Sequence, residues 1–392
     1  MAKIRCLNPI AQVGLDRLAQ GDQIIDSLEG ADAVLVRSAN MHEMELPAGL
    51  KCIARAGAGV NNIAIDDCAD KGVVVFNTPG ANANGVKELV IAGLLMGSRD
   101  IVKGSEWVEA NSGDPAISKS MEKAKKNFAG TEIRGKKLGV IGLGAIGVLV
   151  ANAAHDLGMD VYGCDPYLSI SNAIRLSRYV HIVKTNEELY RTCDYLTIHV
   201  PALDSTRGML NRTAFGMMKD GVVILNYARD ILVNDDDMGE ALASGKVRRY
   251  VCDFPNAKNV TFPNTVFTPH LGASTRESED NCAVMAVDEI NDYLANGNIT
   301  NSVNYPAASL GTVRKAARIC VAHYNRPNVI SQLTALCGQE GINISDMVSK
   351  SRGDYAYAMF DVEAPVAQDF KEKLSGMDNV IRVRILTPEG EE

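Results

Sequence analysis

The sequence predicts an α/β protein with two doubly wound parallel sheets, one Rossmann-like and one flavodoxin-like, followed by a ferredoxin-like α+β domain. Short β-rich runs alternate with helical stretches over the first hundred residues and again from residue 137, which is typical of parallel α/β units. A glycine-rich turn, GLGAIG, follows the first strand of the second series. The last segment, 312–392, has a β-α-β-β-α-β order.

The composition is that of an ordinary globular protein with more than one domain. Its 392 residues carry a net charge of −8 with acids and bases interspersed, so we expect no nucleic-acid or membrane surface. Nine cysteines without a CxxC pair are typical of reduced thiols, and the start MAKIRCLNPI lacks a signal-peptide pattern. We therefore expect a cytoplasmic protein without a metal site.

Periodicity predicts how these elements group into three domains. The first is discontinuous (1–98 and 280–302), because RESEDNCAVMAVDEINDYLANG has apolar residues at helical spacing and is expected to pack back on the first layer. Residues 99–279 form the second domain and 312–392 the third. The segment NITNSVNYPAASLGT (298–312) is rich in Asn, Pro and Ser and is predicted to be a linker.

The turn GLGAIG has the spacing of a dinucleotide-binding site. Gly142 allows a tight turn, Gly144 lets the backbone approach a pyrophosphate, and Gly147 lets helix and strand pack closely. The next strand ends in Asp165, where a carboxylate can accept hydrogen bonds from both hydroxyls of an adenosine ribose. A 2′-phosphate would face this carboxylate, so the sequence favours NAD over NADP.

Two residues at other strand ends are candidates for catalysis. Arg229, in LNYARD, either pairs with Asp230 or binds a carboxylate in bidentate fashion. His270, in VFTPHLGAST, is either a loop histidine satisfied by backbone groups or a general acid/base. Because both follow strands of one sheet, they are expected at the same edge. Such a pair can hold a 2-hydroxy acid and move its hydroxyl proton.

GLGAIG, Asp165, NYAR, CDF and TPHLGAST resemble the D-isomer-specific 2-hydroxyacid dehydrogenase family, and the resemblance covers essentially the whole chain. It implies NAD-dependent oxidation of a phosphorylated 2-hydroxy acid, with 99–279 as the NAD-binding domain, the first domain binding substrate, and 312–392 as a regulatory ACT domain. With the glycine-rich turn included, the expected NAD contacts are Thr78, Gly142, Gly144, Ala145, Ile146, Gly147, Asp165, Val200, Pro201, Thr206, Tyr227, Ala228, Arg229, Asp253, His270, Gly272 and Ala273. The expected substrate contacts are Arg37, Ser38, Asn40, Ala58, Gly59, Val60, Lys87, Arg229 and His270.

The two substrate stretches, RSAN (37–40) and GAGVNN (57–62), also make sense as anion sites. Both follow strands, and glycines leave backbone N–H groups available to a carboxylate. Arg37 and Lys87 are assigned to a phosphate, the alternative being solvated surface charge.

The sequence departs from the family at one position. The family carries a glutamate that pairs with the catalytic histidine, and Lys258 aligns with it here. Either Asp253 takes over as the catalytic acid, or Glu277 reaches in, or His270 works unpaired.

Further expectations concern regulation, oligomeric state and rival functions. HYNRPNVIS resembles an ACT effector loop, with Asn325 as a contact for L-serine, although a purely structural or dimerising role stays open. Asn328 stands where the family has Gly and can adopt positive φ. A homodimer or homotetramer is expected. The rivals are another 2-hydroxy acid as substrate and a non-catalytic NAD-sensing module.

Overall fold

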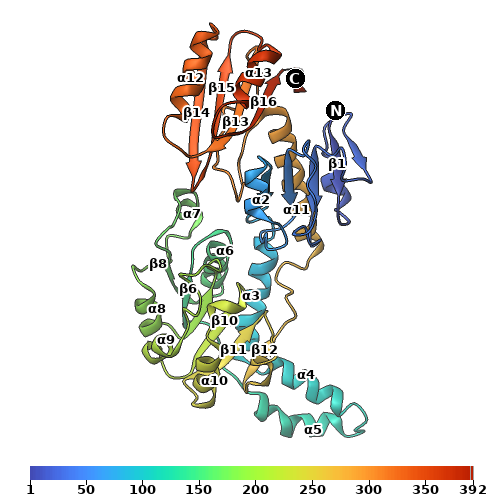
Figure 1. The fold of residues 1–392 in the computed structure, drawn as a ribbon. Coiled ribbons are helices and arrows are strands. Elements are labelled where there is room, and N and C mark those ends of the chain that lie inside the picture. The colour runs from blue at the N-terminus through green and yellow to red at the C-terminus, as the bar shows by residue number, and fades with distance from the viewer. Residues whose placement is uncertain (389, 392) are drawn as a thin grey trace. The chain divides into compact units, whose positions relative to one another are not determined.

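The structure, a computed structural model, describes residues 1–388, 390 and 391, which form two compact units (Figure 1). Unit 1 comprises Met1–Asn82 and Arg276–Glu392, and unit 2 comprises Ala83–Thr275. Unit 1 contains one parallel and one antiparallel sheet, and unit 2 one parallel sheet. The predicted fold class is thereby confirmed. No helix in the described part of the chain is long and apolar enough to cross a membrane.

The parallel sheet of unit 1 has the flavodoxin-like strand order β2-β1-β3-β4-β5. Its strands are β1 (Lys3–Cys6), β2 (Gln23–Ile25), β3 (Ala33–Val36), β4 (Cys52–Arg55) and β5 (Val74–Asn77). Its helices are α1 (Gln12–Leu15), α2 (Ile65–Asp70) and α11 (Arg276–Asn296). Successive strand residues face opposite sides, so Leu35 joins the core that contains α11 and Val34 joins the other core. Helix α11 packs against this layer and is followed by Gly297, which has φ +70°.

The sheet of unit 2 is parallel and has the order β12-β11-β10-β9-β6-β7-β8. From β6, successive strands of the chain are added first on one side and then, from β9 onward, on the other, so the strand order reverses between β6 and β9. Its strands are β6 (Lys137–Ile141), β7 (Asp160–Cys164), β8 (His181–Ile182), β9 (Tyr195–Ile198), β10 (Val222–Asn226), β11 (Val247–Cys252) and β12 (Thr265–Phe267). Helices α3 (Ala83–Ser98) and α6 (Ala145–Asp156) cover one face. The other face is covered by α8 (Asn186–Thr192), α9 (Arg212–Met217) and α10 (Asp235–Ala243).

Three more helices of unit 2 lie outside these layers. The last buried residue of α3 is Ser98, and the chain continues as α4 (Ile101–Ala110) and α5 (Ile117–Ala124). Neither α4 nor α5 has a buried residue, and both extend away from the sheet of unit 2 (Figure 1). Helix α7 (Ile170–Arg175) follows β7.

The C-terminal domain, residues 312–391, has the predicted ferredoxin-like order. Its elements are β13 (Ala317–Tyr324), α12 (Val329–Gln339), β14 (Ile344–Arg352), β15 (Tyr355–Val362), α13 (Gln368–Ser375) and β16 (Val380–Thr387), with the short β17 (Gly390–Glu391) added at the edge. One face of its antiparallel sheet packs on α12 and α13. The other face contributes Cys320, Met359 and Leu386 to the core that also contains α11 and Leu35.

The segment 298–312 is not a linker, and that prediction is wrong. Ser302 pairs with Phe76 beside β5, and the buried side chain of Asn304 accepts from the Val75 amide (2.9 Å) and donates to the Val73 carbonyl (2.8 Å). Tyr305 is fully buried and donates to the Ala69 carbonyl (2.7 Å). The polar side chains that suggested a solvated linker satisfy backbone groups of the sheet instead.

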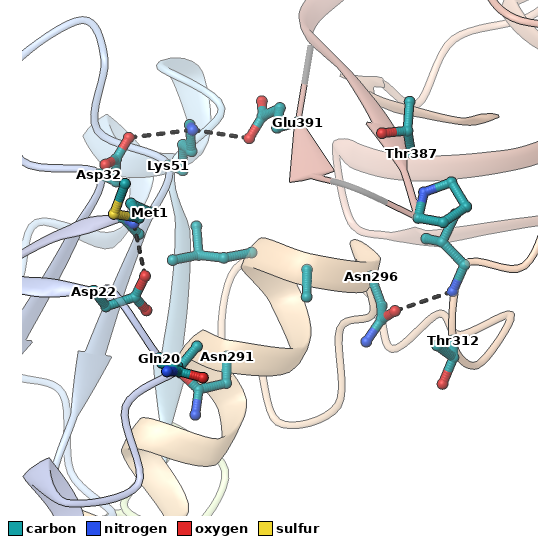
Figure 2. A pocket seen from close by; sticks show the side chains of 16 residues that line it. Met1, Gln20, Asp22, Asp32, Lys51, Asn291, Asn296, Thr312, Thr387 and Glu391 are labelled. Carbon is teal, nitrogen blue, oxygen red and sulfur yellow. Dashed lines mark hydrogen bonds and ion pairs between the residues drawn. The ribbon is translucent and has the colours of Figure 1, made fainter. Parts of the chain in front are cut away.

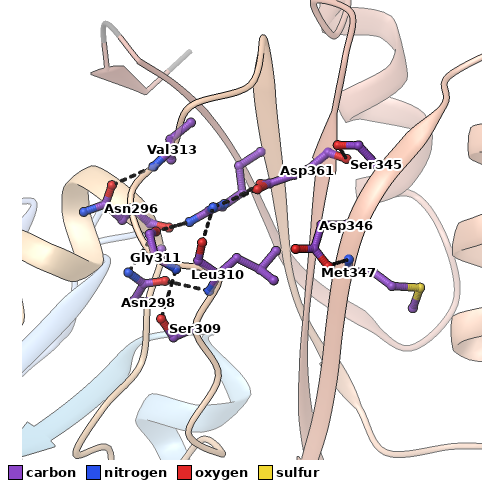
Figure 3. A network of polar contacts seen from close by, with 12 residues as sticks. Asn296, Asn298, Ser309, Leu310, Gly311, Val313, Ser345, Asp346, Met347 and Asp361 are labelled. Carbon is purple, nitrogen blue, oxygen red and sulfur yellow. Dashed lines mark hydrogen bonds and ion pairs between the residues drawn. The ribbon is translucent and has the colours of Figure 1, made fainter.

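Two buried arginines of the C-terminal domain bind the end of α11. Arg318 forms a bidentate pair with Asp361 (2.6 and 2.9 Å) and donates to the Asn296 carbonyl (2.9 Å). Arg384 donates to the carbonyls of Tyr293 and Leu294 (3.0 and 2.9 Å). The last carbonyls of a helix lack partners within the helix, and cations there also favour its dipole. Figure 3 shows Asn296, Leu310, Gly311 and Asp361 meeting around this network.

A cavity of about 530 Å³ lies between β17, the N-terminus and the end of α11 (Figure 2). Lys51 bridges Asp32 (3.2 Å) and Glu391 (2.8 Å) at its wall. No predicted site residue lines it, so it is separate from the candidate active site.

We expect a chain ending at residue 311 to lose the stability of unit 1, since the cut removes Met359 and Leu386 from a shared core and uncaps α11. Circular dichroism melting of the shortened and full chains checks this. A shift of the unit 1 transition by at least about 10 °C is expected, equivalent to a few kcal/mol. Unchanged melting would contradict the shared core.

Glu289 on α11 makes the stability of unit 1 depend on pH. Its Oε1 accepts from Asn301 (2.6 Å), while Oε2 is buried without a partner among the described residues. Burial raises the pKa of Glu289 to about 7. The folded state therefore keeps a proton that the unfolded state releases above roughly pH 4.5, and stability falls as pH rises toward 7.

We expect Glu289→Gln, which imitates the protonated form, to be more stable than the parent at pH 8 by on the order of 2–3 kcal/mol and nearly equal at pH 4.5. Urea unfolding at both pH values measures this difference. Asp280→Asn, on the same helix but partly exposed, serves as the control. A difference that does not grow with pH would show that Glu289 is already ionised in the folded state.

Candidate active site

The glycine-rich turn between β6 and α6 has the predicted local geometry. Gly142 has φ +91°, and a Cβ there would lie 2.7 Å from the His199 carbonyl oxygen. A Cβ on Gly147 would lie 1.9 Å from the Gly142 carbonyl oxygen. Gly144, the N-cap of α6, faces open space, and Ala145 and Ile146 begin the helix. The turn thus leaves a helix N-terminus accessible to an anion.

Asp165 lies at the end of β7, beside this turn. Its Oδ2 accepts from the Leu143 amide (2.9 Å) and its Oδ1 from the Tyr167 amide (2.8 Å). These bonds hold a half-buried carboxylate next to the glycines, where the ribose of a dinucleotide is expected.

The loop after β9 lies at the point where the strand order reverses. Thr206 closes it by donating to the Pro201 carbonyl (2.7 Å) and accepting from the Leu203 amide (2.9 Å), and Val200 lies at its start. Sequence reasoning missed His199. Burial lowers its pKa to about 3, so its ring is neutral, with one nitrogen 2.9 Å from Thr197 Oγ1. The only signal was a histidine directly before Val-Pro at a strand end.

Arg229 follows β10 in a loop that a buried asparagine organises. Asn226 accepts from the Ala228 amide (3.1 Å) and donates to the Arg229 carbonyl (2.9 Å). Arg229 is exposed, its Nη1 donates to the Ala228 carbonyl (2.6 Å), and among the described residues it forms no ion pair with Asp230. Tyr227 is buried, with its hydroxyl beneath Gly93, where a Cβ would lie 2.4 Å away. Since the Arg229 guanidinium donates to one carbonyl of its own loop, it retains N–H donors for a ligand.

Asp253 shapes the loop that carries His270. The buried carboxylate accepts from Thr268 Oγ1 (2.5 Å) and from the amides of Leu271 and Gly272 (2.8 Å each), and Ala273 follows in the same loop. His270 has φ +56°, an uncommon conformation for a residue with a side chain, and its amide donates to the Asp253 carbonyl (3.0 Å). The positive φ is a strain that the Asp253 hydrogen bonds maintain.

The ring of His270 is exposed, and its nitrogens have no hydrogen-bond partner in the described part of the chain. The Asp253 carboxylate binds the loop backbone and not this ring. Lys258 pairs with Asp236, and Glu277 belongs to unit 1. The three alternatives for the missing glutamate therefore stay predictions.

Phe254 brings the two candidate catalytic groups together. The Arg229 guanidinium lies 6.0 Å from the centre of its ring, and the His270 ring centre lies 4.8 Å from it. The only local sign of Phe254 is that an aromatic residue directly follows Asp253. Unit 2 alone thus assembles a cation and an imidazole at the carboxyl edge of its sheet.

The predicted substrate stretches lie in unit 1. Asn8 Oδ1 accepts from the amides of Arg37, Ser38 and Ala39 (2.9, 3.0 and 3.0 Å), and Asn40 follows in the same turn. In the second stretch Gly57 has φ +147° and the Ala58 carbonyl accepts from Asn77 (2.6 Å), with Gly59 and Val60 next in the chain.

Arg55 was missed, although it ends β4 directly before the second stretch. Its Nε donates to the Arg37 carbonyl (3.0 Å), and a Cβ on Gly57 would lie 1.8 Å from its Nη1. Fully buried Thr78, whose amide donates to the Gly57 carbonyl (3.1 Å), also belongs to unit 1. Lys87 lies on α3 in unit 2, 3.7 Å from Glu88. Arg37 and Arg55 therefore supply the cations near the turn glycines.

Comparisons with known proteins identify the family of this chain. A profile of the NAD-binding domain of D-isomer-specific 2-hydroxyacid dehydrogenases matches residues 91–272. The chain is 30% identical over 386 residues to D-3-phosphoglycerate dehydrogenase of Escherichia coli K12, covering 93% of this chain and 89% of that protein. The chain belongs to the D-isomer-specific 2-hydroxyacid dehydrogenase family. It is also 29% identical over 380 residues to the D-3-phosphoglycerate dehydrogenase of Haemophilus influenzae, with the same shares covered.

A solved structure agrees with the family. It is an NAD⁺-bound 3-phosphoglycerate dehydrogenase of Entamoeba histolytica, 26% identical, with a TM-score of 0.61, covering 77% of this chain and 98% of that one. NAD is therefore the cofactor of this 2-hydroxyacid dehydrogenase. The open Gly144 and the fixed Asp165 carboxylate fit its pyrophosphate and ribose.

We expect this dehydrogenase to prefer NAD over NADP by at least about tenfold in kcat/KM, since a 2′-phosphate beside Asp165 costs more than roughly 1.4 kcal/mol. Asp165→Asn should narrow the ratio, and Asp160→Asn, five residues earlier on β7, should not. Equal kcat/KM values for the two cofactors would rule out this role of Asp165.

Proposed function

We propose that the chain oxidises D-3-phosphoglycerate to 3-phosphohydroxypyruvate with NAD, the first step of L-serine synthesis. The observation that carries the proposal is that Arg229 and His270 both lie next to the Phe254 ring, in a family whose relatives named above are 3-phosphoglycerate dehydrogenases. When bound, NAD supplies the acceptor for the hydride that leaves C2.

The proposed roles follow from the chemistry of each side chain. The His270 imidazole takes the hydroxyl proton in oxidation and returns it in reduction. The Arg229 fork binds the carboxylate and stabilises charge at the C2 oxygen. Asp253 positions His270 through the loop backbone and is not itself the proton acceptor.

The substrate anion is assigned to unit 1. Ser38, Asn40, Ala58, Gly59 and Val60 offer backbone or short polar groups, and Arg37 supplies charge for the phosphate. Arg55 is added to this set because its guanidinium lies beside Gly57. Lys87 is also assigned to the substrate phosphate. The NAD contacts are those that the family resemblance implies.

We assign residues 312–392 as an ACT domain that senses L-serine. Asn325 donates to the Gly353 carbonyl (3.0 Å), and Asn328 holds the expected turn at φ +67°. Tyr324, next to Asn325, donates to Asp70 at the end of α2 (3.0 Å). A change in this loop thus reaches the helix that follows residues 57–62.

A homodimer or homotetramer and a cytoplasmic location complete the proposal. Helices α4 and α5 expose Ile101, Val108 and Met121 by about half, and a second copy would cover them. The nine cysteines are all unpaired thiols, typical of a reducing compartment.

We expect steady-state oxidation of D-3-phosphoglycerate to exceed that of D-glycerate at least about a hundredfold in kcat/KM, because a charged phosphate contact is worth about 3 kcal/mol. Arg229→Ala should remove most of kcat/KM, while NAD affinity measured without substrate should change little.

Two outcomes would point to the rivals. Preference for an unphosphorylated acid would identify another 2-hydroxyacid dehydrogenase. NAD binding without turnover of any acid in the panel would identify an NAD-sensing module.

A further inference from the structure

Arg37, the cation assigned to the phosphate, already has a partner. Its Nη2 lies 2.6 Å from Oε1 of Glu279 in the first turn of α11, and both side chains remain nearly half exposed. An exposed pair of this kind is weak and readily exchanged, because water and salt screen it. Glu279 is thus already paired with Arg37, the guanidinium that the substrate phosphate would need to bind.

The surrounding structure keeps this pair in the anion site. Three amides of the 37–39 turn bind Asn8, so the Arg37 backbone is fixed and only its side chain can reorient. The Arg55 Nε binds the Arg37 carbonyl (3.0 Å), which joins the second guanidinium to the same turn. The carboxylate, the turn and both arginines all belong to unit 1.

We propose that Glu279 is a displaceable counter-ion that sets the affinity of the enzyme for phosphorylated substrate. It holds Arg37 in the unliganded protein, and the substrate phosphate must displace it. A substrate without the phosphate does not bind Arg37, so Glu279 does not change the affinity of the enzyme for such a substrate. This inference rests on the proposed function, in which Arg37 binds the phosphate.

The sign of the effect follows from the charges. A phosphate monoester carries nearly two negative charges at pH 7 and offers three acceptor oxygens, so it outcompetes one carboxylate for a guanidinium. The displaced Glu279 stays nearby on a long, rigid helix and repels the phosphate. Both the exchange and the repulsion weaken binding of the phosphorylated substrate.

Glu279→Gln tests this directly, because the amide keeps the shape and loses the charge. We expect the KM for D-3-phosphoglycerate to fall about three- to tenfold, with the KM for D-glycerate changed less than about twofold. A readout without turnover is the rise in melting temperature on adding inorganic phosphate, against sodium chloride of equal ionic strength. That rise should be larger in Glu279→Gln than in the parent.

Asp288→Asn is a matched control. Asp288 lies on the same helix and pairs with Arg17 at 2.7 Å, with similar exposure of both side chains. This variant should leave the KM values and the phosphate-induced shift unchanged.

The outcomes separate the inference from the proposed function. If the parent prefers D-3-phosphoglycerate but Glu279→Gln leaves its KM and phosphate shift unchanged, Glu279 is only a structural ion pair and the inference is overturned. If the parent shows no preference for the phosphorylated acid, the proposed function fails whatever the variant does.

Discussion

Side-chain acceptors at the carboxyl ends of the β-strands determine where the catalytic groups of unit 2 lie. Asn226 ends β10, and Asp165 and Asp253 directly follow β7 and β11. Asn226 accepts from an amide of its own loop, Asp165 accepts from amides of its own loop and of the glycine-rich turn, and Asp253 accepts from amides of the loop after β12. A buried amide without a partner is costly, so one such side chain restricts a whole loop to a single path. The positive φ of His270 persists because Asp253 holds the loop on both sides of it. Arg229 and His270 then meet at Phe254 without bonding to each other.

Much of this could be predicted from local sequence, and the exceptions share one cause. The glycines at 142, 144 and 147 show their roles by spacing, because turn geometry depends on neighbours in the chain. The two parallel sheets and the C-terminal order followed from alternating periodicity in the same way. The segment 298–312 misled, since Asn304 and Tyr305 look like linker residues until the sheet 230 or so residues away in sequence is seen to be their partner. Composition shows that a segment is polar, but it does not show which distant group forms hydrogen bonds with its polar side chains.

The same limit applies to the site. Phe254, Arg55 and His199 were missed because each matters through a contact. The Phe254 ring lies near both the Arg229 guanidinium and the His270 ring, the Arg55 guanidinium lies close to Gly57, and the His199 imidazole bonds to Thr197. Asp253 is expected from the sequence as a catalytic acid, yet its carboxylate accepts from Thr268 Oγ1 and from amides of the loop that carries His270. Sequence patterns identify which residues lie at the carboxyl edge of the sheet. The role of each residue depends on its hydrogen-bond partners, which only the structure shows.

An acidic chain that binds an acidic substrate must separate its structural cations from its binding cations. Arg318 and Arg384 are buried and bind carbonyls at the end of α11 together with Asp361 or Glu391, so their donors are committed to joining the C-terminal domain to the sheet of unit 1. Arg229 is exposed and binds one carbonyl of its own loop, and Arg37 is exposed and binds one carboxylate. Guanidinium groups offer five donors each, so the second pair has donors left and the first has almost none. What an arginine already binds therefore decides whether it can hold a ligand, and that is a property of the folded chain that no count of charges reveals.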